Sequence, residues 1–175
     1  GSIAWLSLNE KLIGKIKGGF ILSGVGDSGN LNYKRSRRGD SLMDMAFLRV
    51  LSQREKTRIL DFSPFGYDER QFCSPGFNLP VGCFTRSVFG TYPEYHTSAD
   101  NVSFVKPENL ADSFQLCLSA IDYLETAPTY INLNPKGEPQ LGKRGLYKAM
   151  HDQTVDTKQL QLALLWILNL SDGNN

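Results

Sequence analysis

The feature that most constrains the fold is an apolar run from Phe20 to Val25 that does not alternate with polar residues. A strand with this pattern is covered on both faces, as in the centre of an α/β sheet. The run ends at a Gly-Asp-Ser-Gly segment that contains Asp27. We therefore expect a buried strand followed directly by a turn that carries a carboxylate.

Helix and strand patterns are interspersed along the rest of the chain. The spacing of apolar residues and the capping residues predict helices at 3–13, from Asp40 or Ser41 to about Gln53, at 107–124 and at 157–169. Short strands are expected at 57–62 and 80–87. This order predicts an α/β fold.

The last expected helix is apolar on all sides. Such a helix must be buried against another surface, and this one is too short to span a bilayer. We therefore expect no membrane insertion, and a packing partner that lies beyond Asn175.

Composition narrows the function classes. The 175 residues can form one core, and 19 basic against 18 acidic residues leave a formal charge of +1, which argues against nucleic acid or an anionic membrane as the partner. Cys73, Cys83 and Cys117 form no C-x-x-C pair and no leader precedes them, so a cytoplasmic location and buried thiols are expected. A homo-oligomer is left open.

His96 is one of two histidines and lies in a loop before the helix that begins near Pro107. Imidazole is the commonest side-chain metal ligand, and Asp100 could hold its second nitrogen or bind the ion. From spacing alone, a capping or surface histidine is the commoner interpretation. The other histidine, His151, has no partner motif, so a surface role is expected.

Two further loops carry acidic residues after strands. Asp27 lies where open α/β sheets place their ligands, although aspartate in such a turn can serve conformation alone. Asp68-Glu69-Arg70 follows the strand at 57–62 and could bind metal, orient a histidine or contact substrate, or form a solvated loop. We expect all three loops to converge on one edge of the sheet.

Other motifs are less informative. The basic run 34–38 could contact phosphate, but such runs are most often solvated loops. The chain has no phosphate-binding P-loop, dinucleotide fingerprint or G-x-S-x-G nucleophile elbow. Nucleotide hydrolysis, hydride transfer and serine-hydrolase chemistry therefore lose support.

Three stretches together resemble one family. They are residues 26–29, 62–76 and 95–101, which read GDSG, FSPFGYDERQFCSPG and YHTSADN. In combination they are similar to the bacterial aminopeptidase-like proteins of the zinc exopeptidase superfamily, relatives of leucyl aminopeptidases and glutaminyl cyclases. The resemblance covers nearly the whole chain, including 138–147, and implies a three-layer sandwich with a central mixed sheet flanked by helices, incomplete here.

By this resemblance, His96 and Asp27 are metal ligands of a two-zinc site. Asp68 matches an aspartate of the active-site loop that shapes the site or contacts substrate. The implied reaction is hydrolysis of a peptide or amide substrate. In it the ions lower the pKa of a shared water and polarise the carbonyl, while a glutamate takes the proton.

The resemblance also implies that parts of the site lie outside this chain. The glutamate and the remaining ligands belong to the N-terminal half of the family domain, so we expect residues 1–150 to be the C-terminal part of a catalytic domain. Residues 164–173 resemble the entry to a small winged-helix domain, which makes 151–175 a linker and its first helix. The fragment alone is expected to bind zinc weakly and to be inactive.

Three hypotheses follow. The leading one is a zinc-dependent hydrolase in the longer protein. The alternative is a non-enzymatic peptide- or glycan-binding module on the same fold. Nucleic-acid binding through the winged helix and the run 34–38 is disfavoured by the near-zero net charge.

Overall fold

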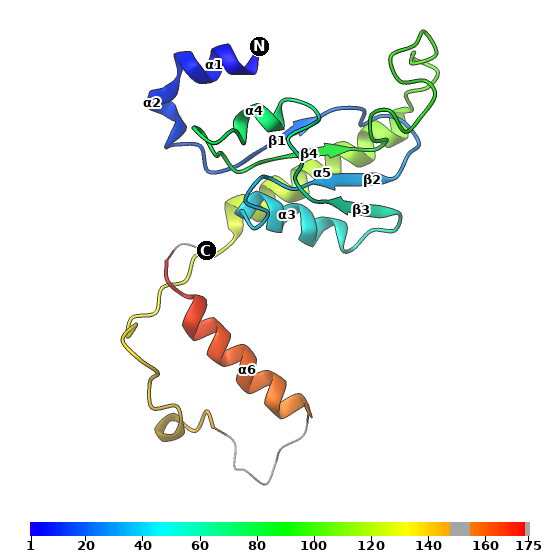
Figure 1. Cartoon of the computed structure of the whole chain (residues 1–175). Helices are drawn as coiled ribbons and strands as arrows, with labels where there is room; N and C mark the ends of the chain where they lie inside the picture. Colours follow the sequence, from blue (N-terminus) through cyan, green and yellow to red (C-terminus); the bar gives the residue numbers. More distant parts are fainter. Residues whose placement is uncertain (148–154, 174–175) are drawn as a thin grey trace. The chain divides into compact units, whose positions relative to one another are not determined.

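The structure is a computed structural model that describes residues 1–147 and 155–173. The chain divides into two compact units, Gly1–Thr126 (unit 1) and Ala127–Asn175 (unit 2). Figure 1 shows the elements of both units coloured along the sequence. The boundary expected after residue 150 falls among residues 148–154, outside the described residues, whereas the two units meet between Thr126 and Ala127.

Unit 1 contains a four-stranded mixed sheet. Its strand order is β1-β4-β2-β3, with β1 parallel to β4, β2 parallel to β3, and β2 antiparallel to β4. The strands are β1 (Gly19–Leu22), β2 (Leu31–Lys34), β3 (Thr57–Leu60) and β4 (Val81–Thr85). The expected mixed sheet is confirmed, and β2 is a strand that the sequence did not predict.

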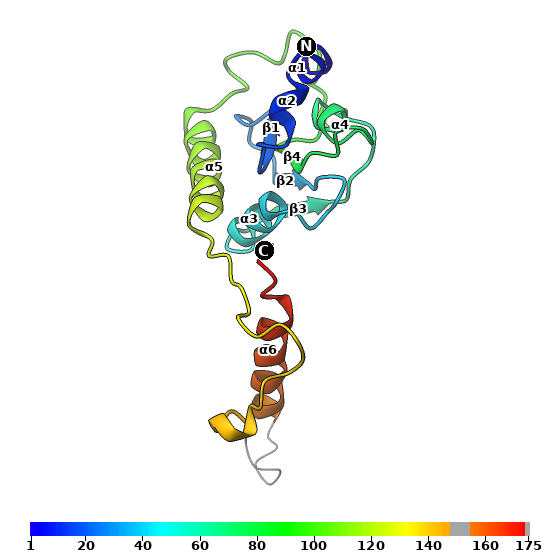
Figure 2. The same cartoon turned by 90° about the vertical axis from the view of Figure 1, so that its left-hand side faces the viewer.

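Helices cover both faces of the sheet and complete three layers, as Figure 2 shows with α5 and α4 on opposite sides. One face carries α3 (Leu42–Leu51) and α5 (Pro107–Thr126), whose buried residues share a core with β2 and β4. The other face carries α1 (Ser2–Leu8), α2 (Glu10–Ile13) and α4 (Glu69–Phe72) around a smaller core that includes Leu6 and Val81. The expected α/β sandwich is therefore present.

The larger core is organised around Phe47 of α3. Its ring stacks on Tyr33 at 4.3 Å between centroids and contacts Phe20 and Phe84. Tyr33 lies so close to Gly82 of the adjacent strand β4 that a Cβ on this glycine would overlap the tyrosine hydroxyl. The absence of a side chain at Gly82 therefore lets Tyr33 cover the sheet.

A buried carboxylate fixes the start of α3. Ser41 caps the helix and forms a capping box with Asp44, which also accepts hydrogen bonds from the Tyr33 hydroxyl and from the backbone and hydroxyl of Ser36. Burial alone raises the pKa of Asp44, but the hydrogen bonds from Ser36 and Ser41 outweigh burial and hold that pKa below its ordinary value. The charged form is thus built into the fold.

The position of β1 differs from the expectation. Its apolar run predicted a central strand covered on both faces, yet β1 lies at the edge of this sheet and Leu22 is half-exposed. The strand buried along its whole length is β4. The reason is the topology, because β4 inserts between β1 and β2, the strand that follows β1 in sequence.

The described residues of unit 2 include α6 (Val155–Leu170) and a short 3₁₀ turn (Gly142–Arg144). The backbone pairs Ile131 with Asp172, which ties the start of the unit to its end. The helix expected at 157–169 is confirmed, but its side chains are not buried: Leu160, Trp166 and Ile167 are all more than half exposed. None of the described helices is long and apolar enough to cross a membrane.

Candidate functional site

Asp27 is a buried carboxylate in the turn after β1, as its sequence position predicted, and only 3% of its surface is exposed. Its Oδ1 accepts hydrogen bonds of 2.6 Å from the Gly29 backbone and from the Ser87 hydroxyl. Its Oδ2 accepts a longer bond of 3.3 Å from the Ser87 backbone. The turn after β1 and the segment after β4 therefore hold the carboxylate in one orientation.

The Asp27 carboxylate borders a cavity of about 280 Å³ that Asp100 and Tyr92 also line. Burial, together with the nearby charges of Asp100 and Asp27, raises the pKa of Tyr92 to about 12. The Tyr92 hydroxyl thus remains protonated at neutral pH. The cavity offers two carboxylates and one phenol, a set that suits a cation or a ligand with hydrogen-bond donors.

His96 lies in the loop after β4 and is exposed. Its backbone has φ of +59°, an uncommon conformation for a residue other than glycine, and its ring stacks on Tyr95 with 4.0 Å between centroids. His96 does not line the cavity next to Asp27. The two expected ligands, Asp27 and His96, therefore do not share a cavity. Ring contacts connect them instead, because Tyr95 stacks on His96 and contacts Tyr92, which lines the cavity next to Asp27.

These rings form a continuous group, here called the aromatic cluster. Tyr92 contacts Tyr95 at 5.6 Å, Tyr95 contacts Phe89 at 6.4 Å, and Phe89 contacts both Phe65 and Tyr67 at 5.4 Å. Phe104 stacks on Tyr92 and completes the cluster. The cluster joins the loop after β3 to the loop after β4.

Asp68 and Glu69 differ sharply although they are adjacent. Asp68 is exposed at the start of α4 and makes no side-chain capping bond. Glu69 is only 1% exposed and forms an ion pair of 2.5 Å with Lys34 of β2. The exposed carboxylate remains free to meet a ligand, whereas the buried one is committed to the fold.

The three loops do not all follow the same edge of the sheet. Because β1 and β4 are parallel, Asp27 and His96 both follow strands that end at one edge. β3 is parallel to β2, which is antiparallel to β4, so the carboxyl end of β3 lies at the opposite edge. The strand before the Asp68 loop therefore ends at the opposite edge, and that loop reaches the loop of His96 through Phe65 and Tyr67, which contact Phe89 of the aromatic cluster.

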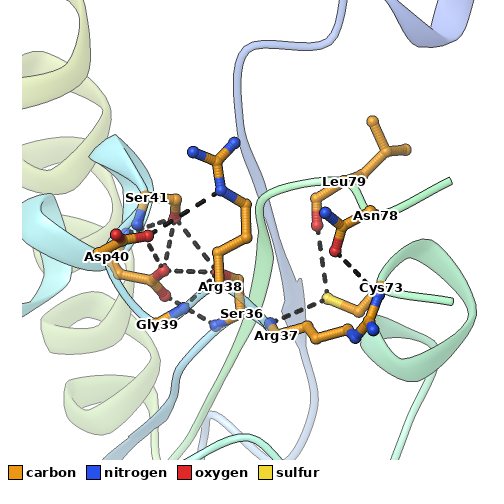
Figure 3. Close-up of polar contacts among 10 residues, drawn as sticks. Ser36, Arg37, Arg38, Gly39, Asp40, Ser41, Cys73, Asn78 and Leu79 are labelled. Carbon is orange, nitrogen blue, oxygen red and sulfur yellow. Dashed lines mark hydrogen bonds and ion pairs between the residues drawn. The ribbon is translucent and has the colours of Figure 1, made fainter. Parts of the chain in front are cut away.

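The basic run 34–38 divides into a buried and an exposed part. Lys34 is mostly buried in its pair with Glu69. Figure 3 shows that Arg37 lies beside Asn78 and Cys73, with its backbone donating to the Cys73 sulfur, while Arg38 reaches toward Asp40. The prediction of a solvated basic run is therefore wrong for Lys34, its first residue. The three cysteines are free and buried, as expected.

Comparison with known proteins identifies the family. The model for a domain of unknown function, DUF4910, matches residues 1–127, and a winged helix-turn-helix model matches residues 128–175. The chain belongs to the DUF4910 family. The two matches meet next to the division between unit 1 and unit 2.

A curated relative from Clostridium acetobutylicum is 47% identical over 100% of this chain and is named as a candidate polysaccharide biosynthesis protein with an aminopeptidase-like domain. This chain spans 40% of that relative's length. A crystal structure of a candidate peptidase from the same organism is 46% identical, with a TM-score of 0.73, and the match covers 100% of this chain and 38% of that one.

More distant structures share the fold. A zinc aminopeptidase from Bacillus subtilis is 19% identical with a TM-score of 0.56, and the match covers 71% of this chain and 32% of that one. An aminopeptidase from Aneurinibacillus sp. strain AM-1 is 20% identical with a TM-score of 0.56, covering 70% and 29%. The DUF4910 unit therefore has an aminopeptidase-like fold.

The donor set in this DUF4910 chain matches zinc in chemistry but not in number. Carboxylate oxygens and imidazole nitrogen are ordinary zinc ligands. Within residues 1–147 and 155–173, however, no group of three histidine, cysteine, aspartate or glutamate side chains could hold a metal ion. The described residues do not complete a zinc site, and His151 lies outside them.

Two residues of the site escaped the sequence reasoning, and a third was named without its role. Ser87 holds Asp27 from a position sixty residues away, and no sequence spacing indicates this contact. Tyr92 was hidden among ordinary loop residues. Glu69 was named with its loop, and Tyr67 and Phe72 around that loop indicated partial burial, but nothing in the sequence indicated its ion pair with Lys34.

Proposed function

We propose that the longer protein that contains this DUF4910 chain is a zinc-dependent, aminopeptidase-like hydrolase of a peptide or amide substrate. In this proposal Asp27 and His96 are metal ligands, Asp68 contacts substrate, and the remaining ligands lie outside this chain. The observation that carries it is the buried carboxylate of Asp27, which is held in a fixed orientation beside a cavity that Asp100 and Tyr92 also line.

The fixed orientation is what a metal ligand requires. Hydrogen bonds from Ser87 and Gly29 concentrate on Oδ1 and leave Oδ2 with only the longer bond from Ser87. A carboxylate whose neighbours already orient it loses little freedom when it binds an ion. Asp68, exposed at the start of α4, can accept a hydrogen bond from a substrate ammonium group.

The family supports the same reading. Relatives named for peptidase or aminopeptidase-like domains share the sequence, and two aminopeptidases share the fold. A fold alone hosts many activities, so the proposal depends on the residues named above.

The test uses the longer protein, prepared with zinc and assayed on aminoacyl amides. We expect about two zinc ions per chain, and a loss of hydrolysis in Asp27→Asn and His96→Ala. Asp40→Asn is the control, because Asp40 carries the same charge on a well-exposed side chain away from the cavity. A longer protein that neither binds zinc nor cleaves any aminoacyl amide would contradict the proposal.

The second candidate is a non-enzymatic module that binds a peptide or glycan. The aromatic cluster favours it, because rings such as the well-exposed Phe65 offer apolar faces to a ligand. The name of the curated relative, which refers to polysaccharide biosynthesis, is consistent with a glycan. Binding of a peptide or oligosaccharide without hydrolysis, weakened by Phe65→Ala but not by Asp27→Asn, would select this function.

A further inference from the structure

The ion pair between Lys34 and Glu69 is nearly withdrawn from solvent. Lys34 Nζ lies 2.5 Å from Glu69 Oε1, and the two side chains are 11% and 1% exposed, respectively. Burying two charges is costly, and replacing such pairs by apolar residues is often neutral or stabilising. The pair therefore calls for an explanation other than stability.

Lys34 uses its remaining donors on one loop. Besides pairing with Glu69, its ammonium group donates to the backbone oxygens of Ser63 at 3.0 Å and Phe65 at 2.7 Å. Gly66 has φ of +145°, and a Cβ there would lie 2.5 Å from Glu69 and 2.9 Å from Lys34. The loop is thus pressed against the ion pair at a position that only glycine fits.

Contacts run from this loop to His96. Phe89 receives the rings of this loop and itself contacts Tyr95, with 6.4 Å between the two centroids. Burial is the main cause that raises the pKa of Tyr67 above its ordinary value. The rings of Phe65 and Tyr67 both contact Phe89. Tyr95 in turn stacks on His96 with 16° between the planes. Each step is a direct contact between neighbouring groups.

One oxygen of Glu69 has no hydrogen-bond partner within residues 1–147 and 155–173. Its Oε2 is buried without a hydrogen bond, and Glu69 borders a cavity of about 30 Å³ together with Tyr67 and Thr85. A space of this size accommodates roughly one water molecule. The carboxylate therefore pairs with Lys34 through one oxygen, while Glu69 also borders this small space.

We propose that Glu69 is a positioning residue for His96. It orients the Lys34 ammonium group, which holds the loop from Ser63 to Tyr67, and this loop sets the position of Tyr95 and hence of the imidazole ring. The inference rests on the proposed function only in regarding His96 as a metal ligand. The positioning itself is tested on this chain without metal.

The experiment is proton–carbon NMR of the histidine rings at a fixed pH where imidazole is neutral. The chain has only two histidines, so His96→Gln assigns the signal, and Tyr95→Leu gives its value without the stacked ring. We expect Glu69→Gln to move the His96 signal toward the Tyr95→Leu value. Asp68→Asn, an adjacent and exposed carboxylate, is the matched control and leaves the signal in place.

A double variant separates positioning from stability. Lys34→Met with Glu69→Leu removes both charges and should recover the thermal stability lost in Glu69→Gln. It cannot hold the backbone oxygens of Ser63 and Phe65, so the His96 signal should still lack the stacking shift. An unshifted His96 signal in both Glu69→Gln and the double variant overturns the inference. If the His96 signal shifts as expected but the longer protein binds no zinc, the inference stands and only the proposed function is contradicted.

Discussion

The two units use apolar side chains in opposite ways. In unit 1, α5 buries Leu116, Cys117 and Ala120 in the core shared with α3. In unit 2, α6 is just as rich in apolar residues, yet Leu160 and Trp166 are more than half exposed. The difference shows that an apolar helix acquires a core only where a second surface faces it.

The largest expected effect on this contrast comes from Phe47→Ala. Phe47 is fully buried and touches three other rings, so the substitution should lower the free energy of unfolding of unit 1 by roughly 3–5 kcal/mol. Chemical denaturation followed by near-UV circular dichroism measures the change. A loss below 1 kcal/mol would mean that the core tolerates a cavity of this size.

A smaller effect is expected from Asp44→Asn, which keeps the shape of the side chain but removes the charge. The variant should lose about 2 kcal/mol at pH 7, because the buried donors of Ser36 and Ser41 then lack a full acceptor.

The pH dependence of this effect has a definite sign. The folded pKa of Asp44 lies below its unfolded value, so its contribution is fully present above the unfolded value near 4 and disappears as the pH falls through the folded pKa. Denaturation curves of wild type and variant should therefore converge in acid. Parallel curves down to the lowest accessible pH would contradict the assignment.

Thiol labelling tests the closed core of unit 1 alone, since all three cysteines lie in that unit. Burial raises the pKa of Cys83 to about 12 and that of Cys117 to about 11, which keeps both as unreactive thiols. A thiol reagent at pH 8.5 should modify the native chain at least ten times more slowly than the chain in denaturant. Equal rates would show that unit 1 opens readily.

The smallest effect is expected on α6. Leu160→Gln should change the free energy of unfolding by no more than about 0.5 kcal/mol, because Leu160 is 66% exposed and has little contact to lose. Leu116→Gln on α5 is the matched change at a buried position. A large loss for Leu160→Gln would reveal that α6 has a packing surface in solution, and would erase the contrast between the units.

Sequence predicted the elements that depend on local pattern. The helices at α3 and α5, with Ser41 as a cap and Pro107 at the first turn, and the carboxylate at the end of β1 all follow from spacing and turn chemistry. Burial of the cysteines likewise followed from their type.

What sequence missed depends on partners that lie far away along the chain. β2 was hidden because Lys34 looked like part of a solvated basic run, whereas Glu69 neutralises it in the interior. The edge position of β1 follows from strand order, which no local pattern encodes. Glu69 itself could be distinguished from Asp68 only by the direction in which α4 faces.

The contact between Tyr33 and Gly82 has a consequence for how this family can vary. A side chain at position 82 has no space while the tyrosine ring is present, so position 82 can change only after the tyrosine has been replaced. Substitutions at the two positions, which lie on neighbouring strands, are therefore expected to be coupled. Relatives that carry a larger residue at 82 should also have replaced the tyrosine, and an evolutionary path between the two states must pass through the combination of glycine with a smaller residue at 33.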